Sequence, residues 1–179
     1  NHTFGGTVTF CSASCSTPSG SLKNVTITDT TELDLTALTL AQVSSAGGNL
    51  IVTAGRALTD TGPLIIPGLT TINATGQTVV LDNTSNNFGT ILFGSSSNAV
   101  TSVEVVDTNA IIIGASNSSG DFTITAGGAV TDSDTVTVGG NLAVTTDAGG
   151  SLVNMGTLEV DGTIALITDG SGAATVVND

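Results

Sequence analysis

Residues 48–60 read GNLIVTAGRALTD and residues 120–132 read GDFTITAGGAVTD, so one apolar, Thr-rich segment occurs twice in the chain. An earlier block is also duplicated, because residues 29–35 (DTTELDL) match residues 107–113 (DTNAIII). The offset is 78 positions for the earlier block and 72 for the later one. Duplication over most of a chain is typical of a solenoid, whose units bury their apolar faces only by stacking on neighbours.

The two ends of the chain resemble the halves of an internal segment. Residues 78–83 (TVVLDN) are soon followed by residues 86–93 (NNFGTILF), whereas the chain ends in TVVND and begins with NHTFGGTVTF. Joined tail to head, the termini nearly rebuild that segment. This match indicates either a tandem module of a longer protein or a subunit that stacks end to end.

We therefore expect one domain over residues 1–179. It would contain imperfect repeats at about residues 1–85 and 86–155, and a partial third repeat at residues 156–179. The N-terminus of a neighbouring copy would complete the third repeat. The contacts would be made by strand-like residues at both ends, namely Thr7, Val8, Phe10, Thr175, Val176 and Val177.

Short runs of alternating Thr and aliphatic residues, closed by Gly, Asn, Asp or Ser, predict many short strands. Residues 33–43 come closest to a helical pattern but fit two short strands about as well. The other predicted strands lie near residues 7–10, 24–28, 49–53, 64–66, 69–73, 78–81, 90–93, 102–106, 110–113, 121–125, 135–138, 141–145, 158–160, 163–167 and 174–177.

The duplication favours a parallel β-helix over a β-sandwich. Strands of a sandwich each occupy a distinct place, whereas a β-helix repeats the same environment coil after coil. The composition fits thin coils, since 23 residues are Gly and only 3% are aromatic. The sequence thus predicts an all-β, single-stranded β-solenoid of about eight coils, with roughly 20 to 25 residues in each.

Charge excludes several classes of partner. Lys23 and Arg56 are the only basic residues against fifteen acidic ones, for a net charge of −13. Nucleic acids and anionic membranes are recognised by clustered Lys and Arg, so neither is an expected partner. The sequence also has no run of roughly eighteen apolar residues and no basic segment leading into an apolar one at its start, so we expect a mature chain without membrane insertion.

Cys11 and Cys15 are the only cysteines and are four positions apart. A small disulfide loop in an oxidising compartment and two free thiols both fit this spacing. With one His in the chain, a zinc-type site cannot be assembled from these residues.

No catalytic or metal-binding residues are predicted. The sole histidine, His2, lies at the extreme end of the chain. Two carboxylate pairs spaced i to i+2, Asp132 with Asp134 and Glu32 with Asp34, would face one side of a strand, but we interpret them as solvated turn residues. A structural calcium ion stays conceivable without being indicated, because the Gly-rich calcium-binding nonapeptide does not occur.

Sequence motifs for glycosylation are frequent. Asn-x-Ser/Thr occurs at Asn1, Asn24, Asn73, Asn83 and Asn117. If the source organism glycosylates secreted proteins, Asn73, Asn83 and Asn117 are the better candidates, because they fall in predicted turns.

The duplicated blocks and residues 135–140 (TVTVGG) resemble the repeats of filamentous-haemagglutinin-like bacterial exoproteins. Residues 80–83 (VLDN) with residues 87–89 (NFG) resemble the linking segment of the same family, so the resemblance covers most of residues 24–150. It implies a right-handed parallel β-helix, export across the outer membrane and a long surface fibre used in adhesion or biofilm structure. The segment from Cys11 to Ser21 departs from that pattern.

We therefore expect a non-enzymatic, secreted β-solenoid that stacks on copies of itself and contacts host or microbial surface glycans or proteins. Two alternatives stay open. One is a β-helix enzyme that degrades polysaccharide, although such enzymes rely on Asp clusters with Arg, Lys or His. The other is a passive spacer of a larger surface adhesin.

Overall fold

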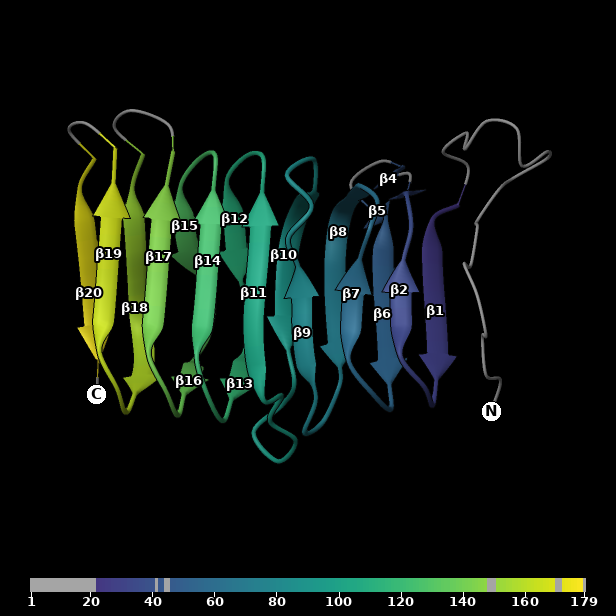
Figure 1. The fold of residues 1–179 in the computed structure, drawn as a ribbon. Helices are drawn as coiled ribbons and strands as arrows, with labels where there is room; N and C mark the ends of the chain where they lie inside the picture. The colour runs from purple at the N-terminus through teal and green to yellow at the C-terminus, as the bar shows by residue number, and fades with distance from the viewer. Residues whose placement is uncertain (1–21, 41, 44–45, 148–150, 170–171, 179) are drawn as a thin grey trace.

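The computed structural model describes residues 22–40, 42–43, 46–147, 151–169 and 172–178 of the chain. These residues wind into stacked coils, and the strands of successive coils pair in parallel, as the two rows of arrows in Figure 1 show. Only the small pair β4 (Gln42–Val43) and β5 (Ala46–Gly47) is antiparallel. The predicted parallel β-solenoid is thereby confirmed, with about seven turns in the described residues.

An eleven-stranded sheet forms the rear of the molecule in Figure 1 and one narrow side. Its rear row holds one strand, or one part of a long strand, from each coil. The rear row consists of β1 (Asn24–Asp29), β6 (Asn49–Ala54), β8 (Leu64–Asn73), β10 (Asn87–Phe93), β12 (Ile111–Ile113), β15 (Val130–Asp132), β18 (Val153–Val160) and β20 (Ala174–Asn178).

A seven-stranded sheet forms the front of the molecule and faces the rear row. The front sheet consists of β2 (Leu33–Leu35), β7 (Leu58–Asp60), β9 (Thr78–Leu81), β11 (Ser102–Asp107), β14 (Phe122–Ala126), β17 (Leu142–Thr146) and β19 (Ile164–Thr168).

The third, narrow side is built from short strands and from the ends of long ones. β3 (Leu38–Thr39) pairs with the first residues of β8. Later in the chain, β13 (Ser116–Ser118) pairs with β16 (Val136–Val138), which pairs with the last residues of β18. β8 and β18 therefore bend, and each serves two sides of the coil.

The core lies between the sheets and is made of aliphatic side chains that stack from coil to coil. Strands alternate buried and more exposed residues, as in β1 and β6. In the front sheet the pairing aligns Leu33 with Leu58, Val79, Val103, Phe122, Leu142 and Ile164 in successive coils. Period-two alternation thus becomes a continuous interior ladder.

The two sequence repeats do not occupy the same side of the solenoid. Pairing carries Leu50 of β6 to Thr70, Ile91 and then Ile113 in three coils. Phe122, which replaces Leu50 in the second repeat, lies nine positions beyond Ile113 and belongs to the front sheet. The offset of 72 residues therefore spans three coils and part of a fourth. As a result, the second repeat is rotated about the solenoid axis, so that its first strand lies in the front sheet and not in the rear row.

This rotation moves the narrow side. In the early coils the chain passes from rear row to front sheet and then through β3. β4 and β5, which follow β3, lie at the top of Figure 1. In the later coils it passes from β12 through β13 at the bottom of Figure 1 before it reaches the front strand β14. Both repeats thus begin with the same order of one longer strand and two short ones: β1, β2 and β3 in the first repeat, and β11, β12 and β13 in the second. The longer strand lies in the rear row in the first repeat and in the front sheet in the second.

Most predicted strands occur within a residue or two of their expected bounds. Four short strands, β5, β7, β13 and β15, were not predicted, because two or three residues are too few to display an alternating pattern. Residues 64–66 and 69–73, predicted as two strands, form the single bent strand β8.

Candidate functional site

The predicted carboxylate pairs are each used in local structure. Asp132 accepts hydrogen bonds from the backbone N–H groups of Gly156 and Thr157 and from the Thr157 hydroxyl, at 2.7 to 3.0 Å. Asp134 instead accepts from the Thr135 N–H at 2.8 Å. Burial would raise the pKa of Asp132, but these hydrogen bonds outweigh it and hold the pKa below its ordinary value.

The second pair is divided in the same way. Asp34 accepts hydrogen bonds from the hydroxyl groups of Thr59 and Thr61, at 3.1 and 2.7 Å, and both threonines belong to the next coil. Glu32 is exposed in the turn that precedes β2. Neither pair therefore places two carboxylates on one substrate-sized site. The interpretation of turn residues fits Glu32 and Asp134, which are exposed and lie outside the strands. It is wrong for Asp34, which lies in β2, and for Asp132, which ends β15.

A buried polar cluster lies where the chain passes between the two repeats. The side-chain amide of Asn86 donates to Asp60 at 2.7 Å and to the Leu81 carbonyl, and its oxygen accepts from the Leu64 N–H. In the next coil Asp107 accepts from the Phe88 N–H at 2.6 Å. Burial is the main cause that raises the pKa of Asp60 and of Asp107 above the ordinary value.

Sequence reasoning missed this cluster. The only signal in the sequence would have been Asp60, Asn86 and Asp107, three separate polar residues next to aliphatic ones. Such residues look like ordinary turn residues in a sequence so rich in Asp and Asn. Every polar group in it has a backbone or side-chain partner, so the cluster serves to close the corner rather than to hold a ligand.

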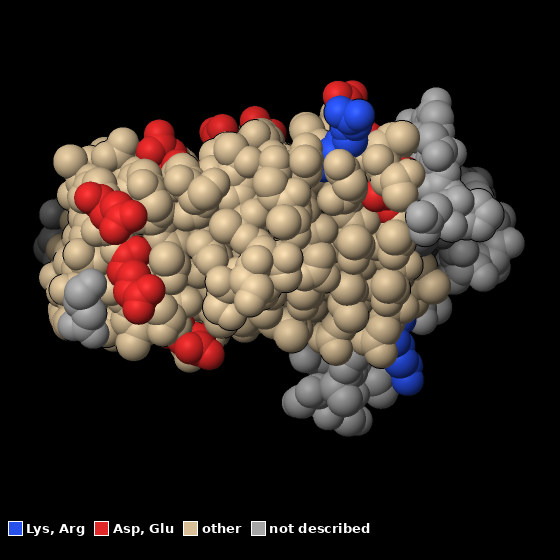
Figure 2. Space-filling view, turned by 90° about the horizontal axis from the view of Figure 1, so that it is seen from below, with Lys and Arg blue, Asp and Glu red and all other residues tan. Residues whose placement is uncertain are grey.

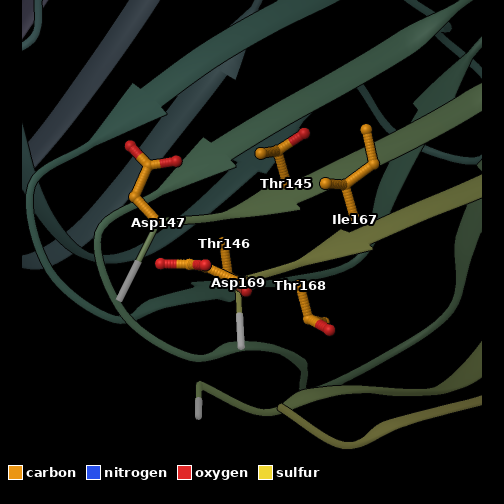
Figure 3. Close-up of a pocket in the computed structure, with 6 residues that line it drawn as sticks. All are labelled: Thr145, Thr146, Asp147, Ile167, Thr168 and Asp169. Atoms are coloured by element: carbon orange, nitrogen blue, oxygen red, sulfur yellow. The ribbon is translucent and has the colours of Figure 1, made fainter. Parts of the chain in front are cut away.

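An open surface hollow of about 350 Å³ lies at the upper ends of β17 and β19. Figure 3 shows Asp147 and Asp169 on one side of it, with Ile167 opposite. The two carboxylates belong to neighbouring coils, because Thr146 pairs with Thr168 directly before them. Hydroxyl groups and two carboxylates can hold a hard cation only weakly, and the described residues contain no group of three or more His, Cys, Asp or Glu placed to hold a metal ion.

A second hollow, of about 320 Å³, lies on the narrow side of the later coils. Its walls include Asp134, Thr137 and Glu159, and Glu159 accepts a hydrogen bond from the Thr137 hydroxyl at 3.0 Å. Asn117 forms another wall, where its amide donates to the carbonyls of Ser95 and Ser96. Hydroxyl, amide and carboxylate side chains line the hollow, and no His, Lys or Cys of the described residues stands beside the Thr137 hydroxyl and Glu159.

The predicted glycosylation residues lie in different environments. Asn73 is the last residue of β8 and is half-buried, so its predicted place in a turn is wrong. Asn83 accepts a hydrogen bond from the Ser85 N–H within a turn, which matches the prediction that it lies in a turn. Asn117 lies in β13, where its amide nitrogen donates to two carbonyls, so its predicted place in a turn is wrong.

Of the residues predicted to contact a neighbour, Thr175, Val176 and Val177 lie in β20. Thr7, Val8 and Phe10 lie outside the described residues, as do Cys11, Cys15 and His2. Among the described strands, β19 pairs only with β17 and β20 only with β18, so each leaves one edge unpaired at the C-terminal end of the solenoid (Figure 1).

The described residues include no helix of the length and apolar character needed to cross a membrane.

Comparison with known proteins identifies one family. Residues 22–93 and again residues 98–155 match a family described as repeats of unknown function (DUF5649). No curated protein and no solved structure matches the chain. The first match begins just before β1, which lies in the rear row, and the second begins just before β11, which lies in the front sheet. Equivalent parts of the two repeats therefore lie on different sides of the solenoid.

Proposed function

Because the chain belongs to this family of repeats, we propose that it is a non-enzymatic structural protein, a length of β-solenoid that copies extend head to tail into a fibre. We place the fibre outside the cell or at its surface, in adhesion or biofilm matrix, where it meets surface glycans or proteins. The resemblance of its repeats to those of filamentous-haemagglutinin-like exoproteins supports this location, as does an acidic surface that resists unspecific association.

The observation that carries the proposal is the incomplete burial of the last coil. Ile164 and Leu166 point inward from β19 but are only half-buried. Their partners one coil earlier, Leu142 and Val144, are fully buried. One further coil, stacked on β19 and β20, would bury these side chains and pair the free backbone edges, which otherwise favour association with another strand.

The geometry of the C-terminal strand fits such a continuation. Residues 78–80 (TVV) lie in β9, which follows the long strand β8 and crosses to the front sheet. Residues 175–177 (TVV) lie in β20, which follows the five-residue strand β19 and crosses to the rear row. β20 therefore corresponds to β9, but lies in the rear row instead of the front sheet. The N-terminal segment of the next copy would follow β20 as β10 follows β9.

Electron microscopy and fibre diffraction of the purified protein test the proposal. We expect fibres with a meridional spacing near ~4.8 Å and a longer axial repeat of about 40 Å, close to one chain. Leu166→Lys places an ammonium group on the stacking end of the core and should abolish the fibres, because burying an unpaired charge is costly. Ala165→Lys, on the exposed outer face of the same strand, is the matched control and should leave the fibres intact.

Discrete monomers of wild-type protein at every concentration would contradict the proposal. Release of reducing ends from an acidic glycan would overturn its non-enzymatic part. A further domain in the same reading frame, with monomers that never stack, would indicate a spacer instead.

A further inference from the structure

One row of outward side chains runs along the whole rear row without a charged residue. Each member pairs with the next through the strand register or through a ladder hydrogen bond. The row consists of Asn24, Asn49, Leu69, Thr90, Ile112, Thr131, Asn154 and Thr175. In a chain with fifteen acidic residues, this uncharged row singles out one surface of the described residues.

The same surface carries most of the exposed aliphatic side chains. Of the six large hydrophobic residues that are exposed in the described part of the chain, only Ile167 lies in the front sheet. The other five lie on or beside the uncharged row and are 39 to 48% exposed: Ile51, Leu69, Ile112, Leu152 and Val177. We call the uncharged row and these five residues the rear face.

Small side chains complete the rear face in the later coils. Backbone hydrogen bonds link Ile111 to Ala129, Val130 to Leu152 and Val153 to Ala173, which aligns Ala129, Leu152 and Ala173 one above another. At the border of the face, the carboxylate of Asp132 is held by the N–H groups of Gly156 and Thr157.

Other carboxylates lie on the front sheet and on the narrow side. Asp34 and Glu104 point outward from the front sheet, and Asp134 and Glu159 line the hollow on the narrow side. Figure 2, seen from below, shows acidic side chains gathered over the C-terminal coils, whereas the two basic residues lie near the other end. Two copies that met through their front sheets would bring like charges together without basic partners.

We infer that the rear face is a lateral contact surface on which a second copy of this chain docks. Along the uncharged row, two chains of net charge −13 can approach without opposing carboxylates. Two flat β-faces of Thr, Asn, Ile, Leu and Ala can pack about 10 Å apart, as sheets do in sandwiches.

The size of the rear face sets the strength of this contact. The eight strands of the rear row, spaced by ~4.8 Å, and an outer width of about 13 Å cover roughly 500 Å² on each copy. Stable pairs bury about 800 Å² on each partner, so an isolated pair should be weak, with a Kd in the micromolar range or above. Copies already aligned in a fibre would bind more tightly through many such contacts.

This contact is additional to the axial stacking proposed above and does not depend on it. Sedimentation velocity of the Leu166→Lys chain, in which axial stacking is blocked, isolates the lateral contact. We expect a concentration-dependent dimer that strengthens between about 20 and 200 mM salt, because salt screens the mutual repulsion of the acidic chains and the contact itself contains no ion pair. An interface held by ion pairs would instead weaken with salt.

Two substitutions on the rear face test the location of the contact. Ile112→Glu and, separately, Leu69→Glu should each weaken the dimer at least tenfold, since each forces a carboxylate into an uncharged contact. Ile167→Glu, a substitution of the same type on the front sheet, should change it less than threefold. All three side chains are exposed, so far-UV circular dichroism should report an unchanged fold.

The proposal is overturned if the Leu166→Lys chain stays monomeric at the highest soluble concentration, or if Ile167→Glu weakens the dimer as much as Ile112→Glu does. Binding of the monomeric chain to an insoluble neutral glycan such as cellulose, lost in Ile112→Glu, would assign the rear face to sugar and also overturn pairing. Wild-type chains that pair laterally yet never form long fibres would support this inference and contradict the axial proposal.

Discussion

Most polar residues buried in this narrow core have a hydrogen-bond partner. Asn86 is fully buried and uses its amide nitrogen and its oxygen on Asp60, Leu81 and Leu64. Thr70, stacked between Leu50 and Ile91, is the contrast, because its buried hydroxyl has no hydrogen-bond partner. An unpartnered buried hydroxyl costs on the order of 1 kcal/mol or more, so Thr70 weakens the coil in which it lies.

The buried carboxylates predict an unusual pH dependence. Burial raises the folded-state pKa of Asp60 and of Asp107 above the ordinary value near 4, so the folded chain binds these protons more tightly than the unfolded chain. The free energy of unfolding should therefore rise as pH falls from 7 through those pKa values. Below about pH 4 the sign reverses for Asp132, whose lowered pKa means that protonation there favours unfolding.

Urea denaturation at pH 7 and pH 5 measures this effect, and we expect the higher midpoint at pH 5. Asp60→Asn should reduce the difference between the two midpoints. Glu104→Gln removes the same charge from an exposed site of the front sheet and should leave more of the difference in place. Equal changes in both variants would indicate that general charge repulsion, rather than the buried carboxylates, sets the pH dependence.

At the scale of the element, the corners determine how closely coils stack. Asn49 accepts a hydrogen bond from the Leu69 N–H at 2.8 Å, and Asn141 accepts one from the Thr163 N–H at 3.0 Å. At these two corners a side-chain amide thus connects the coil to the next one. Gly55 and Gly127 follow equivalent long strands, and a Cβ at either would collide with the backbone of the preceding coil. These corners allow no side chain, which explains why both repeats contain Ala-Gly there.

Gly127→Ala should lower the free energy of unfolding by about 2 kcal/mol or more, because the new methyl group collides with the backbone of Thr108. Gly156→Ala is the matched control. A Cβ at Gly156 meets no atom within 4 Å, so its effect should stay within about 0.5 kcal/mol. Chemical denaturation of both variants measures the difference, and equal stability would show that the corner has room to relax.

For the whole molecule, stability is shared between neighbouring coils. Each inner strand of the front sheet has a partner on both sides, whereas β19 has only β17. In a solenoid the stability of a coil is roughly its own contribution plus those of its two interfaces, so coils with one interface open first.

Hydrogen exchange should reveal this gradient. Amides of β19 and β20 should exchange at least tenfold faster than those of β14, which has β11 and β17 as neighbours. Mass spectrometry of peptides from each strand measures the rates. Slow exchange in β19 within assembled fibres, but not in the Leu166→Lys chain, would add support for axial stacking, and uniform exchange in the free chain would contradict the gradient.

The solenoid itself could be inferred from the sequence. The duplicated blocks, the Thr and aliphatic alternation in strands such as β6 and β14, and the scarcity of bulky residues are local features, and local features determine which residues form strands and which side faces inward. The uncharged residues of the rear row could also be read from the sequence. Their alignment could not, because only the strand register shows that Leu69 and Ile112 lie in one row.

Only the tertiary structure decided how the repeats lie around the axis. The number of residues per coil varies from 26 between β3 and β8 to 19 between β12 and β15, and it depends on how tightly each corner closes against its neighbour. Because that closure is a contact between coils, no local pattern reports it. The rotation of the second repeat, the junction at Asp60 and Asn86, and the uncharged rear face all follow from this accumulated register.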